Sequence, residues 1–216
     1  MNTSMGMILC IISGLCWSTV YVDSIRTGFK QKTYCMPLFA LGLNVAWEGI
    51  YAYYEVIGRG NVSLQGIANT VWVLLDVVIV ITYFKYCKND CKTVLEKKAQ
   101  IPFGVLTFAI CITIQVLFVY EFGDTKAEIY SAYLQNIAMS MAYLYMLNRR
   151  QSSKGQTKLI AVCKWFGTLA PTLIGIIEHN AFIICTGIIC FILDGLYFYF
   201  LCYVKKKEYH ITEQYR

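Results

Sequence analysis

The sequence contains few of the residues on which most soluble enzymes depend. Only 15% of its 216 residues are charged, whereas a soluble domain carries about 25%. It has two histidines and three prolines, and no P-loop, GxGxxG, HExxH or GxSxG segment. Nucleotide binding, zinc hydrolysis and serine hydrolysis therefore have no support. We expect neither a cofactor nor a metal.

The ten cysteines do not form a recognisable framework. Most lie inside apolar runs, where cysteine behaves as a small hydrophobic residue. Cys87 and Cys91 are four residues apart, but no histidine or second cysteine pair is near them in the sequence. The sequence therefore predicts neither a metal site at this pair nor a disulfide framework.

Apolar residues dominate what is present. They make up 57% of the chain, and they gather in blocks of about 20 residues, the length that crosses the hydrocarbon of a bilayer. The blocks do not alternate as barrel strands do. The sequence predicts an all-α, polytopic membrane protein with one domain over residues 1–216. Its seven transmembrane helices are expected near residues 5–22, 34–57, 66–86, 102–120, 127–147, 158–177 and 181–204.

The basic residues predict the orientation of these spans. Of the 19 lysines and arginines, 16 fall on the side of the C-terminus, and only Arg59 and Lys126 fall on the other. Basic residues accumulate in cytoplasmic loops, so the N-terminus is expected outside and the C-terminus in the cytoplasm. Lys164 lies inside the sixth span and is expected to extend toward the basic side. No basic, aromatic-rich helix indicates a nucleic-acid partner.

Three carboxyl groups lie near the middle of predicted spans: Glu48, Asp76 and Asp194. A charged side chain at the bilayer centre costs about 2.5–3.5 kcal/mol on insertion scales, so an intramembrane acid indicates a functional site. The simpler alternative is a carboxylate bound to a neighbouring helix by hydrogen bonds. Three ionised carboxylates at one depth would repel, so at least one is expected to hold a proton that it can donate.

Helical spacing places each acid on a face with polar and aromatic residues. The three faces are Asn44, Glu48, Tyr51 and Glu55; Asn69, Trp72, Asp76 and Tyr83; and Thr186, Cys190, Asp194 and Tyr197. The amides Gln115, Gln135 and Asn136 are expected to link helices. An acid surrounded by aromatic rings suits carbocation chemistry, because the ring faces stabilise a cation without attacking it. The same surroundings suit a proton-coupled transporter.

A short internal similarity supports the transporter alternative. Leu74-Leu75-Asp76 in the third span matches Ile192-Leu193-Asp194 in the seventh, which indicates a 3+1+3 parallel repeat. Carriers of this type have helix-breaking residues in matching spans, whereas Pro171 has no partner in the first half of the chain. A membrane protein without chemistry is a further alternative, but it leaves the three acids unexplained.

Three segments resemble one known family. These segments are Asn44-Val-Ala-Trp47-Glu48-Gly-Ile-Tyr51, Trp72-Val-Leu-Leu-Asp76 and Leu193-Asp194-Gly-Leu-Tyr197. They resemble the N-x-x-W-E-x-x-Y, W-x-x-x-D and L-D-x-x-Y segments of the integral-membrane terpene cyclases of fungal meroterpenoid and indole-diterpene pathways, which also have bacterial relatives. The length and the seven spans agree as well.

The resemblance implies a reaction and its residues. Such cyclases protonate the epoxide or alkene of a prenylated substrate and close its chain into rings through carbocations. Their essential acids match Glu48 and Asp194, with Asp76 as a third candidate. The substrate is then a hydrophobic, prenylated small molecule in contact with Asn44, Trp47, Tyr51, Trp72 and Tyr197.

Overall fold

The computed structural model describes residues 3–58 and 63–214, and every secondary-structure element in these ranges is a helix. The all-α prediction is confirmed. The seven α-helices are α1 (Thr3–Gln31), α2 (Leu38–Tyr53), α3 (Leu64–Tyr86), α4 (Val94–Phe122), α5 (Asp124–Arg150), α6 (Lys158–Ile177) and α7 (Ala181–Gln214). A π-helical turn, Tyr54–Gly58, follows α2, and a 3-10 turn, Cys87–Asp90, follows α3.

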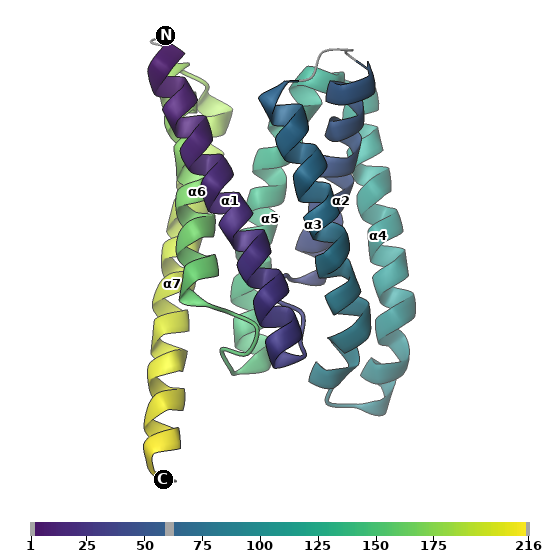
Figure 1. Cartoon of the computed structure of the whole chain (residues 1–216), viewed down its shortest axis with the longest axis vertical. Helices are drawn as coiled ribbons and strands as arrows, with labels where there is room; N and C mark the ends of the chain where they lie inside the picture. Colours follow the sequence, from purple (N-terminus) through teal and green to yellow (C-terminus); the bar gives the residue numbers. More distant parts are fainter. Residues whose placement is uncertain (1–2, 59–62, 215–216) are drawn as a thin grey trace.

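The helices form one bundle in which the short helix α2 lies among its neighbours. Five helices (α1, α3, α4, α6 and α7) are long and apolar enough to cross a membrane. The other two are α2, with only 16 residues, and the more polar α5. α2 packs against α3, α4 and α5, and α5 also packs against α7 (Figure 1). Their polar faces therefore contact protein, and the predicted face of Asn44, Glu48, Tyr51 and Glu55 is buried.

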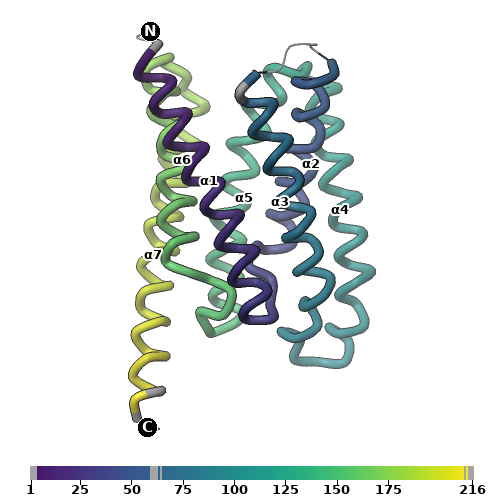
Figure 2. Tube along the Cα trace, viewed as in Figure 1, coloured from purple at the N-terminus to yellow at the C-terminus, as the bar shows by residue number. Residues whose placement is uncertain are grey.

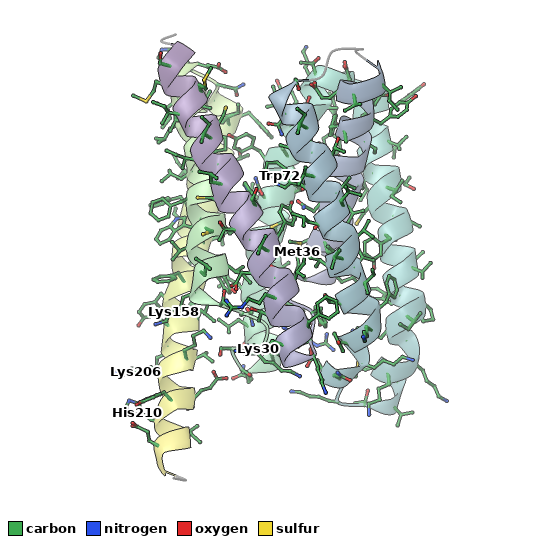
Figure 3. The ribbon with its side chains drawn as sticks, viewed as in Figure 1. Lys30, Met36, Trp72, Lys158, Lys206 and His210 are labelled. Atoms are coloured by element: carbon green, nitrogen blue, oxygen red, sulfur yellow. The ribbon has the colours of Figure 1, made fainter. Side chains whose placement is uncertain are left out.

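The bundle has two sides that meet at α5 and where α1 packs against α3. α1, α6 and α7 lie together on one side, and α2, α3 and α4 lie on the other (Figure 2). The start of α1 and the end of α7 lie at opposite ends of the bundle. Figure 3 shows Lys30, Lys158 and Lys206 toward the end where the C-terminus lies. We call this end, with the α1–α2, α3–α4 and α5–α6 connections, the basic end.

The structure corrects several predicted boundaries. α1 continues to Gln31, so Arg26 and Lys30 belong to a helix and not to a loop. α4 begins at Val94, well before the predicted start at residue 102, because Thr93 caps it by accepting the backbone N–H of Glu96. Hydropathy marks where hydrocarbon begins, whereas caps and packing decide where a helix begins. Of the basic residues counted above, Arg59 and Arg216 lie outside the described residues, and the orientation in the membrane stays a prediction.

The crossing of α6 and α7 depends on two glycines. A Cβ atom at Gly187 would overlap the side chain of Thr172, and one at Gly175 would overlap Ile183. Small residues let helix backbones approach closely, which is a main source of helix association in membranes.

We expect Gly187→Ala to lower stability although alanine is the better helix former. The methyl group overpacks the crossing, which costs about 1–3 kcal/mol, and thermal unfolding in detergent measures the loss. Gly14→Ala is the matched control, because a Cβ there meets nothing within 4 Å. Equal stability of the two variants would show that α6 and α7 can move apart at this crossing without a loss of stability.

Candidate active site

Four buried side chains from three helices, Glu48 among them, form one cluster. Tyr21 of α1 donates its hydroxyl hydrogen to Oε1 of Glu48. The side-chain nitrogen of Asn44 lies 3.0 Å from the same oxygen and 2.9 Å from Oδ2 of Asp76 on α3. Asn44 and Glu48 come together because they are four residues apart on α2. None of the four side chains is more than 4% exposed.

The Asn44 amide thus bridges two carboxyl groups. Oε2 of Glu48 and Oδ1 of Asp76 are buried and have no hydrogen-bond partner among the described residues. Two carboxylates that share one donor repel strongly where water is excluded, so a single bound proton stabilises the pair. The arrangement is therefore suited to holding one transferable proton. We call Glu48 and Asp76 the acid pair, and Asn44 its bridge.

A cavity of about 350 Å³ opens beside this cluster, away from the basic end. Its volume is near the lower limit of the roughly 300–1,000 Å³ typical of ligand pockets. Glu48, Asn44 and Tyr21 line it, and its aromatic walls come from Trp17, Trp47 and Trp72. Asp76 does not line it and lies behind Glu48.

Two of the tryptophan rings, those of Trp47 and Trp72, are held in place by their N–H groups. Trp47 donates to the backbone oxygen of Glu128 at 3.0 Å, and Trp72 donates to the hydroxyl of Ser18 at 3.1 Å. Figure 3 shows Trp72 between the helices, far from the lysines of the basic end. With the N–H groups occupied, the rings present apolar, electron-rich faces, which attract cations.

Asp194 belongs to a different cluster. Its Oδ1 lies 2.7 Å from Nζ of Lys164, and that nitrogen also donates to the hydroxyl of Ser140 at 2.6 Å. The expected extension of Lys164 toward the basic side is wrong: the side chain is fully buried, because Asp194 and Ser140 provide partners inside the bundle. The structure brings Glu48 together with Asp76 and not with Asp194.

The predicted binding residues divide in the same way. Asn44, Trp47 and Trp72 line the cavity. Tyr51 is buried behind the wall, with its ring 5.1 Å from that of Trp47. Tyr197 lies on the side of Asp194 and donates to Oε1 of Gln156 at 3.1 Å. Neither tyrosine lines the cavity.

Sequence reasoning missed the contribution of α1. Trp17 and Tyr21 both line the cavity, and their spacing of four, continued by Ser13 and Cys10, is a helical face that the pattern could have revealed. The link between Gln115 and Gln135 is confirmed, at 3.1 Å between α4 and α5. Within residues 3–58 and 63–214, no cluster of histidine, cysteine or acidic side chains has the arrangement of a metal site.

Comparison with known proteins identifies the family. A family model for Pyr4-like transmembrane terpene cyclases matches residues 3–207. The chain belongs to this cyclase family. It is therefore an integral membrane protein, as the five long apolar helices also indicate.

Curated relatives of this cyclase-family chain come from fungi. It is 28% identical to the Pyr4-family terpene cyclase mfmH of Annulohypoxylon moriforme, over 78% of this chain and 68% of the relative. It is 25% identical to the terpene cyclase pyr4 of Aspergillus fumigatus, over 92% and 86% of the two chains. The asnovolin H synthase nvfL of Aspergillus novofumigatus is 27% identical, over 80% and 69%. No solved structure matches the chain. The transporter alternative is not favoured.

In this cyclase-family protein the Lys164–Asp194 pair should support the fold strongly. We expect Lys164→Met to cost about 3–5 kcal/mol, because it leaves Asp194 as an uncompensated buried charge. Removing both charges in Lys164→Met/Asp194→Leu should recover most of the loss. The yield and thermal stability of monodisperse protein in detergent measure both effects.

The control for this prediction is an ion pair that solvent reaches. Glu96→Gln breaks the ion pair of Glu96 with Arg149, whose side chain is 40% exposed; that of Glu96 is 35% exposed. Its loss should cost less than about 1 kcal/mol. A Lys164→Met variant no less stable than Glu96→Gln would contradict the proposed importance of the buried pair.

Proposed function

We propose that this protein cyclises a prenylated substrate, with or without a terminal epoxide, by proton transfer from the carboxyl group of Glu48. One observation carries the proposal. Glu48 lines an aromatic-walled cavity and is bridged to a second buried carboxyl group by Asn44. Family membership supports cyclase chemistry. A hydrophobic substrate suits a cavity with three tryptophan walls inside a membrane protein.

The proposed reaction begins at the acid pair. The O–H bond of the Glu48 carboxyl group breaks as its proton binds the epoxide oxygen or an alkene carbon, and the substrate becomes a cation. Each ring forms when an alkene of the chain donates its electron pair to that cation. The last cation loses a proton to a carboxylate, so the product is an isomer of the substrate. Glu128 and Glu178 also line the cavity and are candidate acceptors.

In our proposal, Asp76 controls whether Glu48 stays protonated. It shares the amide of Asn44 with Glu48 but does not line the cavity, so it acts through Glu48 and is a positioning residue. While Asp76 is negative, Glu48 is expected to remain protonated, because two adjacent carboxylates do not ionise together. A carboxyl group kept neutral in this way is a ready proton donor.

Asp194 supports the opposite wall of the cavity in this scheme. Its partner Lys164 donates a hydrogen bond to the Ser140 hydroxyl. That hydroxyl donates to the backbone oxygen of Asn136 at 2.9 Å. Asn136 lines the cavity. The family resemblance implies that the acid at position 194 is essential, and this chain of contacts offers a physical reason that requires no contact with substrate.

We expect Glu48→Gln to abolish cyclisation, with a loss of about 100- to 10,000-fold, the usual contribution of a general acid. Asp76→Asn should give a smaller loss, because Glu48 keeps its place at the cavity. Membranes containing each variant are incubated with prenylated and epoxy-prenylated aromatic compounds. A cyclised product keeps the mass of its substrate and changes its retention time.

The matched control is Glu121→Gln, which makes the same change at an exposed position outside the cavity. It should retain wild-type turnover. Cyclisation that survives Glu48→Gln in a correctly folded protein would disprove the assignment of the proton donor.

A second prediction concerns how the cavity binds a carbocation, and it can be tested without knowing the natural substrate. A prenyl chain that carries a tertiary ammonium group imitates the carbocation, so it should bind in the cavity and change tryptophan fluorescence. Trp72→Leu should weaken its binding about 2- to 30-fold, since a cation–aromatic contact contributes about 0.5–2 kcal/mol. An uncharged chain of equal length should lose much less. Equal losses for both ligands would mean that Trp72 recognises only the apolar chain.

A further inference from the structure

A second pocket lies at the basic end of the bundle, and the proposed catalytic cavity lies toward the other end. Its volume is about 430 Å³, and it shares no lining residue with that cavity. It lies among the α1–α2, α3–α4 and α5–α6 connections and the nearby turns of α4 and α5. Nothing in the proposed cyclisation requires it.

Positive charge predominates in this pocket. Four basic side chains line it (Lys92, Arg149, Arg150 and Lys154), against one carboxyl group, that of Asp90. Asp90 is already engaged, because its two oxygens each lie 2.9 Å from a cation, one from Arg150 and one from Lys154. Glu96 does not line the pocket, but one of its oxygens lies 3.6 Å from Arg149. Four basic side chains against these two carboxyl groups still leave an excess of positive charge, which favours an anionic ligand.

Arg150 is fixed and retains an unused donor. Its side chain is only 7% exposed, and its guanidinium group lies 4.2 Å from the centre of the Tyr34 ring. Its terminal nitrogens donate to the backbone oxygens of Tyr34 and Lys154, each at 3.0 Å. Nε is buried without a partner among the described residues. A guanidinium group fixed in this way adds a permanent positive charge at a defined place in the pocket wall, which attracts a phosphate group.

The pocket is continuous with the outer surface of the bundle. Phe39, Phe103 and Tyr145 line it, and they are 43%, 58% and 65% exposed, on the outer faces of α2, α4 and α5. In a membrane these faces contact acyl chains. The ligand that fits both parts of the pocket is amphiphilic, with an anionic head among the basic residues and an apolar chain on the aromatic surface.

We propose that this pocket binds an anionic phospholipid. Lys92 and Arg149 bind the phosphate head beside the fixed guanidinium group of Arg150, and one acyl chain lies along Phe39, Phe103 and Tyr145. Basic pockets between transmembrane helices bind lipid head groups of this kind. A zwitterionic lipid has the same phosphate but adds a cation that the pocket repels, so the anionic lipid binds more tightly.

The test uses the full chain, purified in detergent and titrated with phosphatidylglycerol, phosphatidylcholine or inorganic phosphate. Native mass spectrometry measures bound lipid, and thermal unfolding measures stabilisation. We expect one tightly bound phosphatidylglycerol, weaker phosphatidylcholine binding and no stabilisation by inorganic phosphate. Lys92→Gln/Arg149→Gln should weaken phosphatidylglycerol binding about 30-fold, at roughly 1 kcal/mol for each charge.

The control removes the same charge from the same end outside the pocket. Lys206→Gln/Lys207→Gln changes two exposed side chains of α7 and should leave lipid binding unchanged. An equal loss in both double variants would overturn the proposal in favour of general attraction to basic residues. Stabilisation by inorganic phosphate equal to that by lipid would overturn the role of the apolar surface. Unchanged thermal stability of the lipid-free variants shows that a loss of binding is not a loss of fold.

Discussion

Every charged group in the interior of this bundle needs a partner within the bundle, because the surrounding lipid offers none. That constraint explains the two polar clusters. Glu48 and Asp76 are stabilised by the amide of Asn44 and the hydroxyl of Tyr21, whereas Asp194 is stabilised by the ammonium group of Lys164. One cluster joins α1, α2 and α3, and the other joins α5, α6 and α7.

The two clusters give similar residues different properties. An acid beside an amide and another acid is well suited to keep a proton, since nothing nearby compensates two negative charges. An acid beside a lysine instead forms an ion pair, as Asp194 does with Lys164. The cavity lies next to the first cluster only, and this is why we assign proton transfer to Glu48 and a supporting role to Asp194. Environment, and not residue type, separates the roles.

The two ends of the molecule also differ in the charge of their pockets. The cavity near Glu48 has aromatic walls and lies away from the basic end, whereas the pocket beside Arg150 has an excess of positive charge. A hydrophobic substrate and an anionic lipid would therefore not compete for one site. α7, the longest helix at 34 residues, runs from beside the cavity, at Ile183, to the basic end.

The sequence by itself determined the helical class, the membrane location, the family and the burial of Glu48, Asp76 and Asp194. The helical class, the membrane location and the burial of the acids follow from composition and from spacing along one chain, so hydropathy and helical periodicity suffice for them. The family follows from the resemblance of three short segments. Only the tertiary structure decided which acid meets which partner: Asn44 reaches Asp76, and Lys164 reaches Asp194 across 30 positions. Such contacts depend on how helices rotate and cross, and small differences in packing, such as that at Gly187, decide this geometry without leaving a periodic signal in the sequence.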